Sequence, residues 1–209
     1  MRVLVTGGTS GLGLAMATAL AAAGSAVALT GRSGEHARSV AAALPGAVGL
    51  ELDVRDESSV ARAVDEAWSS LGGLDMLVNN AGIGMRTVNP RFMTEPQGFW
   101  QTPVDGFRAV IDTNFTGYFL MAREVTPRLL AAGGGRIVNV SVSDSTKHRA
   151  GFSPYGPSRA GSGGVNKNAI HTTVTIKRAN VFLGVSMAEP RWAKGTGTVN
   201  RRARSERGH

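Results

Sequence analysis

The feature that most constrains this chain is a cluster of glycines directly after its first apolar run. Residues 2–6 are β-rich, residues 7–13 read Gly-Gly-Thr-Ser-Gly-Leu-Gly, and an Ala/Leu-rich helical segment follows over 14–23. A strand, a glycine turn and a helix in this order predict a turn whose backbone approaches a ligand closely. The amino end of the helix adds free N–H groups and a positive dipole end, which together favour binding of a diphosphate.

Strand-like and helix-like segments then alternate along the chain. Further strands are expected at 26–30, 48–52, 74–78 and 136–142, and a further helix at 35–44. Asp56 is expected to cap a helix that runs to Leu71 and ends at Gly72-Gly73. Thr102-Pro103 is a cap and first-turn signal for a long helix to about Ala132, with a bend at Pro127. This alternation predicts an α/β fold with a doubly wound parallel sheet, Rossmann-like, in a single domain. Right-handed crossovers place the loops after the strands along one edge, where ligands bind. Residues 82–102 lack periodicity and are expected to form an excursion loop that lines one wall of the site.

The composition is that of one globular domain without thiol chemistry. The chain has 209 residues, of which 42% are hydrophobic and none is cysteine. The lack of cysteine excludes disulfides and thiolate metal sites. The four histidines are scattered without a metal-binding spacing, so no metal site is predicted. No stretch resembles a membrane span or a signal peptide, and we expect a cytoplasmic location.

The net charge of +8 is concentrated at the carboxyl-terminal end. Up to Gly161 there are 14 basic and 13 acidic residues, whereas from Ser162 onward there are 9 basic and 2 acidic residues. We therefore expect a dinucleotide-binding domain over residues 1–185 and a basic, irregular tail over 186–209. Aromatic residues are not interleaved with these charges, so no nucleic-acid partner is expected.

Five segments, in order, resemble the short-chain dehydrogenase/reductase family. Residues 6–13 are similar to its TGxxxGxG fingerprint, and Asp53-Val54 resembles its adenine contact. The run Asn79-Asn80-Ala81-Gly82 is similar to its NNAG motif, and Asn114 matches its catalytic asparagine. Tyr155-Gly156-Pro157-Ser158-Arg159 resembles its YxxxK element, with arginine in place of lysine. The likeness covers about residues 2–161.

The resemblance implies a nicotinamide dinucleotide as cofactor. The contacts that it implies fall on Gly7, Thr9, Ser10, Gly11, Leu12, Gly13, Arg32, Asp53, Val54, Asn80, Ala81, Gly82, Tyr155 and Arg159. In dinucleotide-binding folds, an acidic residue near the end of the second strand binds the ribose of NAD, whereas an arginine accommodates the 2′-phosphate of NADP. Here Arg32 follows that strand and no carboxylate stands beside it. NADP(H) is therefore preferred, and NAD(H) remains possible.

The resemblance also implies a small-molecule carbonyl or alcohol substrate, with Tyr155 as the acid/base. A cation one helical turn away favours the ionised phenol. Arg159 stands at that position, where it can act by charge but cannot relay protons. The family serine would fall at Val142, so the flanking Ser141 and Ser143 are the candidates for orienting the substrate, and Ser141 is favoured. The resemblance implies that Asn114 supports the site; the family asparagine supports a water relay to the lysine, which Arg159 replaces here.

An alternative interpretation is a nucleotide-binding Rossmann protein with weak or no catalytic activity. The arginine at position 159 favours it, as does the end of the chain, where the segment after the tyrosine element is Gly-rich. Residues 172–176 and 180–185 are strand-like, and 180–183 lie at about the family's distance for a sixth strand. A truncated or frameshifted reading frame would give such an end. Family members commonly pair through the long helix, so a homo-oligomer is a further possibility.

Overall fold

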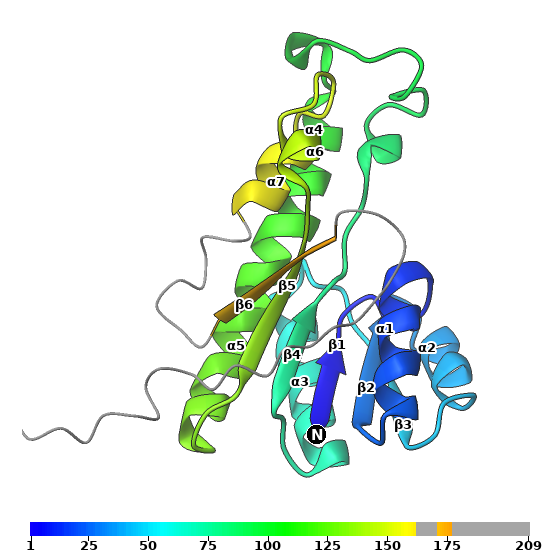
Figure 1. Cartoon of the computed structure of the whole chain (residues 1–209), viewed down its shortest axis with the longest axis vertical. Helices are drawn as coiled ribbons and strands as arrows, with labels where there is room; N and C mark the ends of the chain where they lie inside the picture. Colours follow the sequence, from blue (N-terminus) through cyan, green and yellow to red (C-terminus); the bar gives the residue numbers. More distant parts are fainter. Residues whose placement is uncertain (162–170, 177–209) are drawn as a thin grey trace, which may run out of the picture. The chain divides into compact units, whose positions relative to one another are not determined.

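The computed structural model describes residues 1–161 and 171–176, which contain one parallel sheet (Figure 1). The sheet has six strands in the order β3-β2-β1-β4-β5-β6, and all neighbouring strands are parallel. The strands are β1 (Arg2–Val5), β2 (Ala26–Gly31), β3 (Ala47–Glu51), β4 (Met76–Asn79), β5 (Arg136–Val142) and β6 (His171–Ile176). The predicted doubly wound α/β fold is confirmed.

Helices connect these strands, and all the described elements belong to one compact unit, Met1–Lys177. The helices are α1 (Gly11–Ala22), α2 (Gly34–Ala41), α3 (Glu57–Leu71), α4 (Val104–Ile111), α5 (Gly117–Ala131), α6 (Asp144–Lys147) and α7 (Tyr155–Gly161). The expected excursion loop contains only two short 3-10 turns, Met85–Thr87 and Phe99–Gln101. None of the helices in the described part of the chain is long and apolar enough to cross a membrane.

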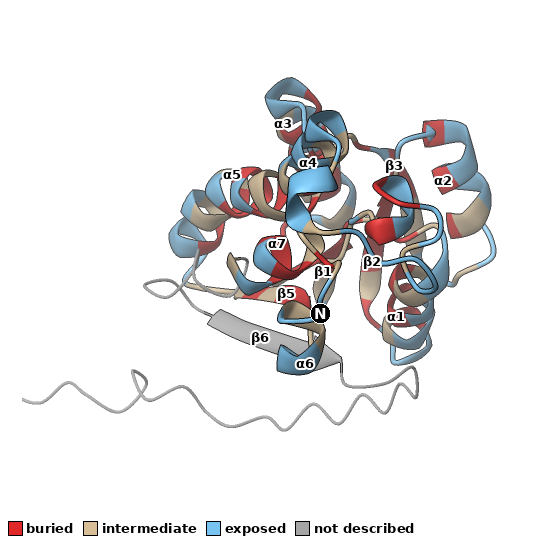
Figure 2. Ribbon diagram, turned by 90° about the horizontal axis from the view of Figure 1, so that it is seen from above, coloured by how far each residue is buried: buried red, intermediate tan, exposed pale blue. Residues whose placement is uncertain are grey.

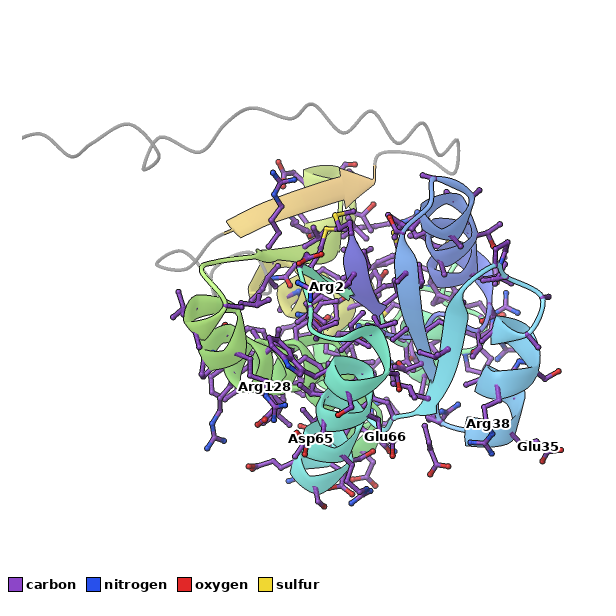
Figure 3. All side chains as sticks on the ribbon, turned by 90° about the horizontal axis from the view of Figure 1, so that it is seen from below. Arg2, Glu35, Arg38, Asp65, Glu66 and Arg128 are labelled. Atoms are coloured by element: carbon purple, nitrogen blue, oxygen red, sulfur yellow. The ribbon has the colours of Figure 1, made fainter. Side chains whose placement is uncertain are left out.

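Alternating strand residues bury the two faces of the sheet under different helices. Val3 and Val5 belong to a core cluster with residues of α1 and α2, whereas Leu4 belongs to the opposite cluster with residues of α3 and α5. This separation follows from the two-residue period of a strand. Figure 2 shows buried residues along the strands and exposed residues on the outer surfaces of the helices. On the second face, an ion pair of 2.7 Å between Arg128 and Asp65 links α5 to α3 (Figure 3).

The third helix begins and ends where the sequence indicated. Asp56 precedes α3, and its carboxylate accepts hydrogen bonds from the N–H groups of Ser58 and Ser59. Gly72 follows the helix with φ of 68°, the left-handed conformation in which glycine ends helices. Both the capping residue and the glycine stop were predicted from the sequence, and both are confirmed.

The predicted long helix from Thr102 to Ala132 is confirmed as continuous helix over Val104–Ala131, but a π turn divides it into α4 and α5. α4 ends at Ile111, the turn spans Asp112–Thr116, and α5 then continues through Pro127 to Ala131. The residue before α4 is Pro103, and no side-chain cap from Thr102 is present. A π turn contains one extra residue, which shifts the helix faces and often marks a functional position. Asn114 lies in the middle of this turn.

The sixth strand falls on the first of the two strand-like runs near the carboxyl end. β6 lies beside β5, with Val174 opposite Val140. The predicted strand over 180–183 lies outside the described residues, and so do the proposed boundary at 185 and the basic tail over 186–209.

Candidate active site and cofactor site

The glycine turn between β1 and α1 packs too tightly to admit side chains on its inner side. A Cβ atom added to Gly13 would lie 2.1 Å from the carbonyl oxygen of Gly7, so glycine is required there. Gly11 has φ of +52°, and a Cβ on it would meet nothing within 4 Å, so its outer side is open. Ser10 precedes α1 and makes no side-chain cap hydrogen bond, so its hydroxyl does not occupy the N–H groups of the first turn. The turn therefore combines a closely approachable backbone with open space at a helix amino end.

Thr6 joins this turn to the segment after β4. Its buried hydroxyl oxygen accepts hydrogen bonds from the N–H groups of Asn80 (2.9 Å) and Ala81 (3.0 Å). The side-chain amide of Asn80 donates in return to the carbonyls of Thr6 (3.0 Å) and Gly7 (3.1 Å). The structure thus uses the Asn80 side chain to brace the turn. The sequence analysis placed Thr6 in the fingerprint over residues 6–13 but assigned it no role in the site.

The loop after β2 carries Arg32 on the surface. Arg32 follows Gly31 directly and is exposed. A Cβ added to Gly31 would lie 2.7 Å from the methyl group of Thr9, so the glycine turn covers the end of β2. Arg32 is also close enough to Asp53, after β3, for its charge to help lower the pKa of that carboxyl. The three segments after β1, β2 and β3 therefore meet at one edge of the sheet.

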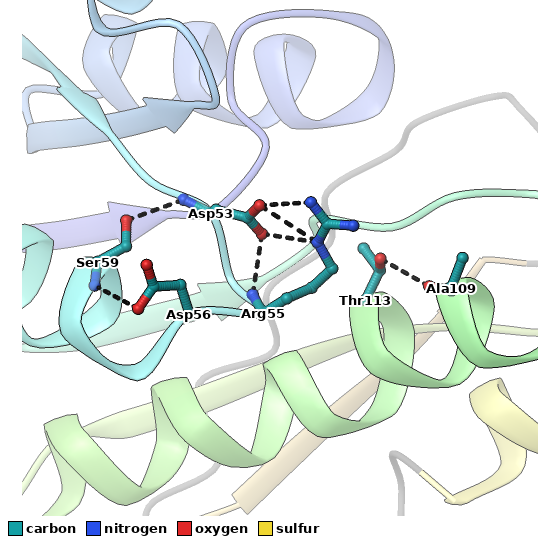
Figure 4. Close-up of polar contacts among 6 residues, drawn as sticks. All are labelled: Asp53, Arg55, Asp56, Ser59, Ala109 and Thr113. Carbon is teal, nitrogen blue, oxygen red and sulfur yellow. Dashed lines mark hydrogen bonds and ion pairs between the residues drawn. The ribbon is translucent and has the colours of Figure 1, made fainter. Parts of the chain in front are cut away.

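Asp53 is bound by a neighbouring arginine (Figure 4). The Nε atom of Arg55 lies 2.9 Å from Oδ1 of Asp53, and Nη2 of Arg55 lies 2.5 Å from Oδ2. Hydrogen bonds from Arg55 are the main reason that the pKa of Asp53 is lowered, and the charge of Arg32 adds to them. Val54 is buried against Gly117, where a Cβ would lie 2.8 Å from a Val54 methyl group. The carboxylate of Asp53, the expected adenine contact, thus forms an ion pair with the guanidinium of Arg55.

Asn114 clamps the segment after β4 to α7. Its buried side chain accepts a hydrogen bond from Ile83 N–H (2.8 Å) and donates one to the Ile83 carbonyl (2.9 Å). The amide nitrogen also lies 3.3 Å from the hydroxyl of Ser158, which is on α7. The π turn places this amide between the two segments, so the Asn114 side chain links Ile83, after β4, to Ser158 on α7.

Tyr155 and Arg159 lie one turn apart on α7, as the sequence predicted. The side chain of Arg159 is turned inward and only 6% of the residue is exposed. Its Cζ atom lies 5.5 Å from the centroid of the Tyr155 ring and 5.3 Å from that of Tyr118. On the side of the NNAG segment, a Cβ added to Gly82 would lie 2.1 Å from Nη2 of Arg159. The structure therefore gathers Tyr155, Arg159, Asn114 and Gly82 at one place.

Burial and two tyrosines govern the charge of Arg159. Burial is the largest single influence and acts to lower the pKa of the guanidinium, but interactions with the hydroxyls of Tyr118 and Tyr155 outweigh it and the pKa is raised. The pKa of Tyr118 is raised mainly by its burial, although the nearby guanidinium opposes that effect. Arg159 is thus a permanent buried cation beside a neutral Tyr118.

The two candidate serines have different surroundings. Ser141 is 2% exposed, and its hydroxyl donates to the carbonyl of Arg159 at 3.0 Å. Ser143 precedes α6, and its hydroxyl lies 3.0 Å from the hydroxyls of both Ser145 and Thr146. The structure therefore directs the Ser141 hydroxyl toward α7, and its predicted contact with a substrate stays a prediction. Side chains along β5 alternate between the two faces of the sheet, and the sequence did not show which of these faces α7 covers.

An open hollow of about 450 Å³ lies between the excursion loop and the segment before α7. Pro96, Phe99, Arg149 and Gly151 contribute to its lining. The rings of Phe152 and Tyr155 lie 6.2 Å apart, which connects this segment to the tyrosine. In the part of the chain that the structure describes, no cluster of His, Asp or Glu is arranged to hold a metal ion.

Comparison with known proteins agrees with this arrangement. A family model described as short chain dehydrogenase matches residues 1–185. The chain is 38% identical over 165 residues to a 2-dehydro-3-deoxy-L-rhamnonate dehydrogenase (NAD(+)) from Sphingomonas sp. strain SKA58, a match that covers 79% of this chain and 63% of that protein. It is 35% identical over 170 residues to the 3-oxoacyl-(acyl-carrier-protein) reductase FabG of Aquifex aeolicus, with 79% and 64% covered.

A solved structure described as a short chain dehydrogenase/reductase family protein is also similar. It superposes with a TM-score of 0.67 at 33% identity, over 78% of this chain and 64% of the other. The chain thus matches less than two thirds of the length of each of these three proteins. On the family match, the relatives and the shared architecture, this chain belongs to the short-chain dehydrogenase/reductase family.

Proposed function

We propose that the chain is an NADP(H)-dependent oxidoreductase that acts on a carbonyl or alcohol group of a small molecule. The observation that carries the proposal is the convergence of the phenol of Tyr155 with the buried cation of Arg159, beside Asn114 and Gly82. This cluster lies at the edge of the sheet where the carboxyl ends of β4 and β5 are found. The glycine turn after β1 opens on the same edge, so a dinucleotide could reach both.

The glycine turn fits the diphosphate of such a cofactor. The open outer side of Gly11 and the amino end of α1 would receive the phosphates, with Gly7, Thr9, Ser10, Leu12 and Gly13 forming the turn. Asp53 and Val54 would line the adenine site. The segment Asn80, Ala81 and Gly82 would lie along the nicotinamide half of the dinucleotide. Tyr155 and Arg159 would contact its ribose.

Arg32 supports a preference for the phosphorylated cofactor. It is an exposed cation after β2, where an arginine suits a 2′-phosphate. A relative that is 38% identical has NAD(+) in its name, so family membership alone does not choose between the two cofactors. The preference therefore depends on Arg32.

When bound, the nicotinamide would supply or accept the hydride. Tyr155 would donate its phenol proton to a carbonyl oxygen during reduction and recover a proton from an alcohol during oxidation. Arg159 would stabilise the phenolate by charge, since its guanidinium lies 5.5 Å from the Tyr155 ring. Asn114 would hold the NNAG segment against α7. Because the Ser141 hydroxyl donates to the Arg159 carbonyl, we assign it to the support of α7 in place of a substrate contact.

A nucleotide-binding protein without turnover is the second candidate. The observation that favours it is the inward direction of Arg159, whose Nη1 atom donates to Tyr118 Oη and to the Val140 carbonyl. A guanidinium engaged in this way has fewer donors for a ribose.

Two measurements separate the candidates. NADPH oxidation against a panel of carbonyl compounds should show turnover, and Tyr155→Phe should lower it by roughly 100-fold or more. NADPH binding without turnover on any carbonyl would favour the second candidate.

The cofactor preference has its own test. Arg32→Ala should weaken NADPH binding by about tenfold while leaving NADH binding nearly unchanged, since it removes one charged contact. Arg123→Ala is the matched control, because Arg123 is an exposed arginine on α5 that pairs with Glu57. Equal effects of both substitutions on NADPH would contradict the assignment of Arg32.

A further inference from the structure

Tyr118 is a buried tyrosine that no sequence motif assigned to the site. It lies on α5, four residues after Asn114, and is 1% exposed. Its hydroxyl oxygen accepts a short hydrogen bond from Nη1 of Arg159 and lies 3.3 Å from the carbonyl oxygen of Val140, to which it donates. Nη1 of Arg159 also donates to that carbonyl, at 3.2 Å. Three elements, α5, α7 and β5, therefore meet at one phenol.

This contact fixes one end of the guanidinium and leaves the other end at the site. Both N–H groups of Nη1 are used by Tyr118 and Val140. The opposite nitrogen, Nη2, lies against Gly82, where a Cβ would be 2.1 Å away from it and 2.9 Å from Oδ1 of Asn114. The Cζ atom of Arg159 also lies near both tyrosine rings, 5.3 Å from the centroid of Tyr118 and 5.5 Å from that of Tyr155. Release of the Nη1 end would allow the whole group to move away from Tyr155.

We propose that Tyr118 is a positioning residue of the active site, which holds the Arg159 guanidinium beside Tyr155 and Gly82. The proposal rests on the proposed function, because it assigns Tyr118 a role in placing a cation that acts on Tyr155. It also accounts for arginine at position 159. A guanidinium is longer than an ammonium group and has donors in a fixed fork, so one side can be anchored while the other faces the site.

A phenol suits this position for two reasons. Its oxygen accepts a hydrogen bond from the guanidinium while its proton is donated to the Val140 carbonyl, so both the acceptor and the donor of the phenol are used. Burial raises the pKa of Tyr118, which keeps it neutral and able to do both. Phenylalanine at 118 would keep the ring beside the guanidinium and remove only the oxygen.

The test is a double-mutant cycle of Tyr118→Phe and Arg159→Lys, measured by NADPH-dependent turnover. In the arginine background, Tyr118→Phe should lower kcat about tenfold, since the displaced guanidinium no longer stabilises the Tyr155 phenolate. In the lysine background the same change should cost less than about twofold, because the anchored guanidinium is absent. An equal loss in both backgrounds would show a merely structural role and overturn the proposal.

A second measurement decides the question without turnover. The chain contains two tyrosines, so protein labelled on tyrosine rings gives two sets of NMR signals. In Tyr118→Phe, only the set from Tyr155 remains. Release of the cation should shift the Tyr155 signals in Tyr118→Phe, and the same change made in an Arg159→Met background should not shift them further. Unmoved Tyr155 signals in Tyr118→Phe would overturn the positioning role. If the wild-type chain shows no turnover while these signals do shift, the proposed function fails and the positioning of Arg159 stands.

Discussion

Gly82→Ala is a direct probe of how firmly Arg159 is held. The new Cβ would lie 2.1 Å from Nη2 of Arg159, and ordinary contacts begin at 3.4 Å, so the guanidinium must retreat by about 1.3 Å. A mobile arginine would do this at little cost. An arginine whose Nη1 is bound to Tyr118 and Val140 must instead lose at least one hydrogen bond from a charged donor, worth about 1.5–3 kcal/mol. We therefore expect Gly82→Ala to lower the free energy of unfolding by about that amount.

Urea unfolding followed by circular dichroism measures this change, and Gly84→Ala is its matched control. A Cβ on Gly84 would meet nothing within 4 Å, and the residue lies two positions further along the same loop. Its substitution should be neutral or stabilise the fold by up to about 1 kcal/mol through the unfolded chain. If Gly82→Ala and Gly84→Ala unfold at the same urea concentration, Arg159 is not anchored as described.

Three further predictions concern neighbouring contacts. Thr6→Val should destabilise the fold by about 2–3 kcal/mol in urea unfolding, because it leaves two backbone N–H groups unpaired, whereas Thr6→Ser should not. Arg55→Ala should raise the pKa of Asp53 toward its ordinary value in an NMR titration. Because the folded-state pKa is the lower one, this pair stabilises the fold fully above about pH 3.9 and loses its effect as the pH falls through the folded-state value, so Arg55→Ala should destabilise at neutral pH but not in acid. Ser141→Ala should lower thermal stability more than Ser143→Ala does, since the buried Ser141 hydroxyl donates to the Arg159 carbonyl on α7; a larger effect of Ser143→Ala would reverse the assignment.

The sheet and several of its connections could be predicted because they depend on local signals. Apolar runs bounded by glycine or proline placed β1 to β5 within a residue or two, and Asp56 was identified as the cap of α3 from its position alone. The order of the family motifs along the chain indicated the family. These features need only neighbours in the sequence.

The parts that could not be predicted depend on contacts between distant segments. The π turn at Asp112–Thr116 could not be recognised from the sequence, because one extra residue hardly changes the helical spacing of the apolar residues. The direction of Arg159 is set by Tyr118 and Val140, which lie 41 and 19 residues away in the chain. The orientation of Ser141 toward α7 follows from which face of β5 that helix covers. Such arrangements follow from tertiary packing, and no sequence motif pointed to Tyr118.

The most direct test is a calorimetric titration of the folded chain with NADPH and NADH, accompanied by amide NMR spectra. We expect NADPH to bind more tightly than NADH, and either nucleotide to shift the amide signals of Gly11, Leu12 and Gly13, where α1 begins. A folded sample that binds neither nucleotide, or that binds one while these amides stay in place, would contradict the assignment of the glycine turn as the diphosphate site.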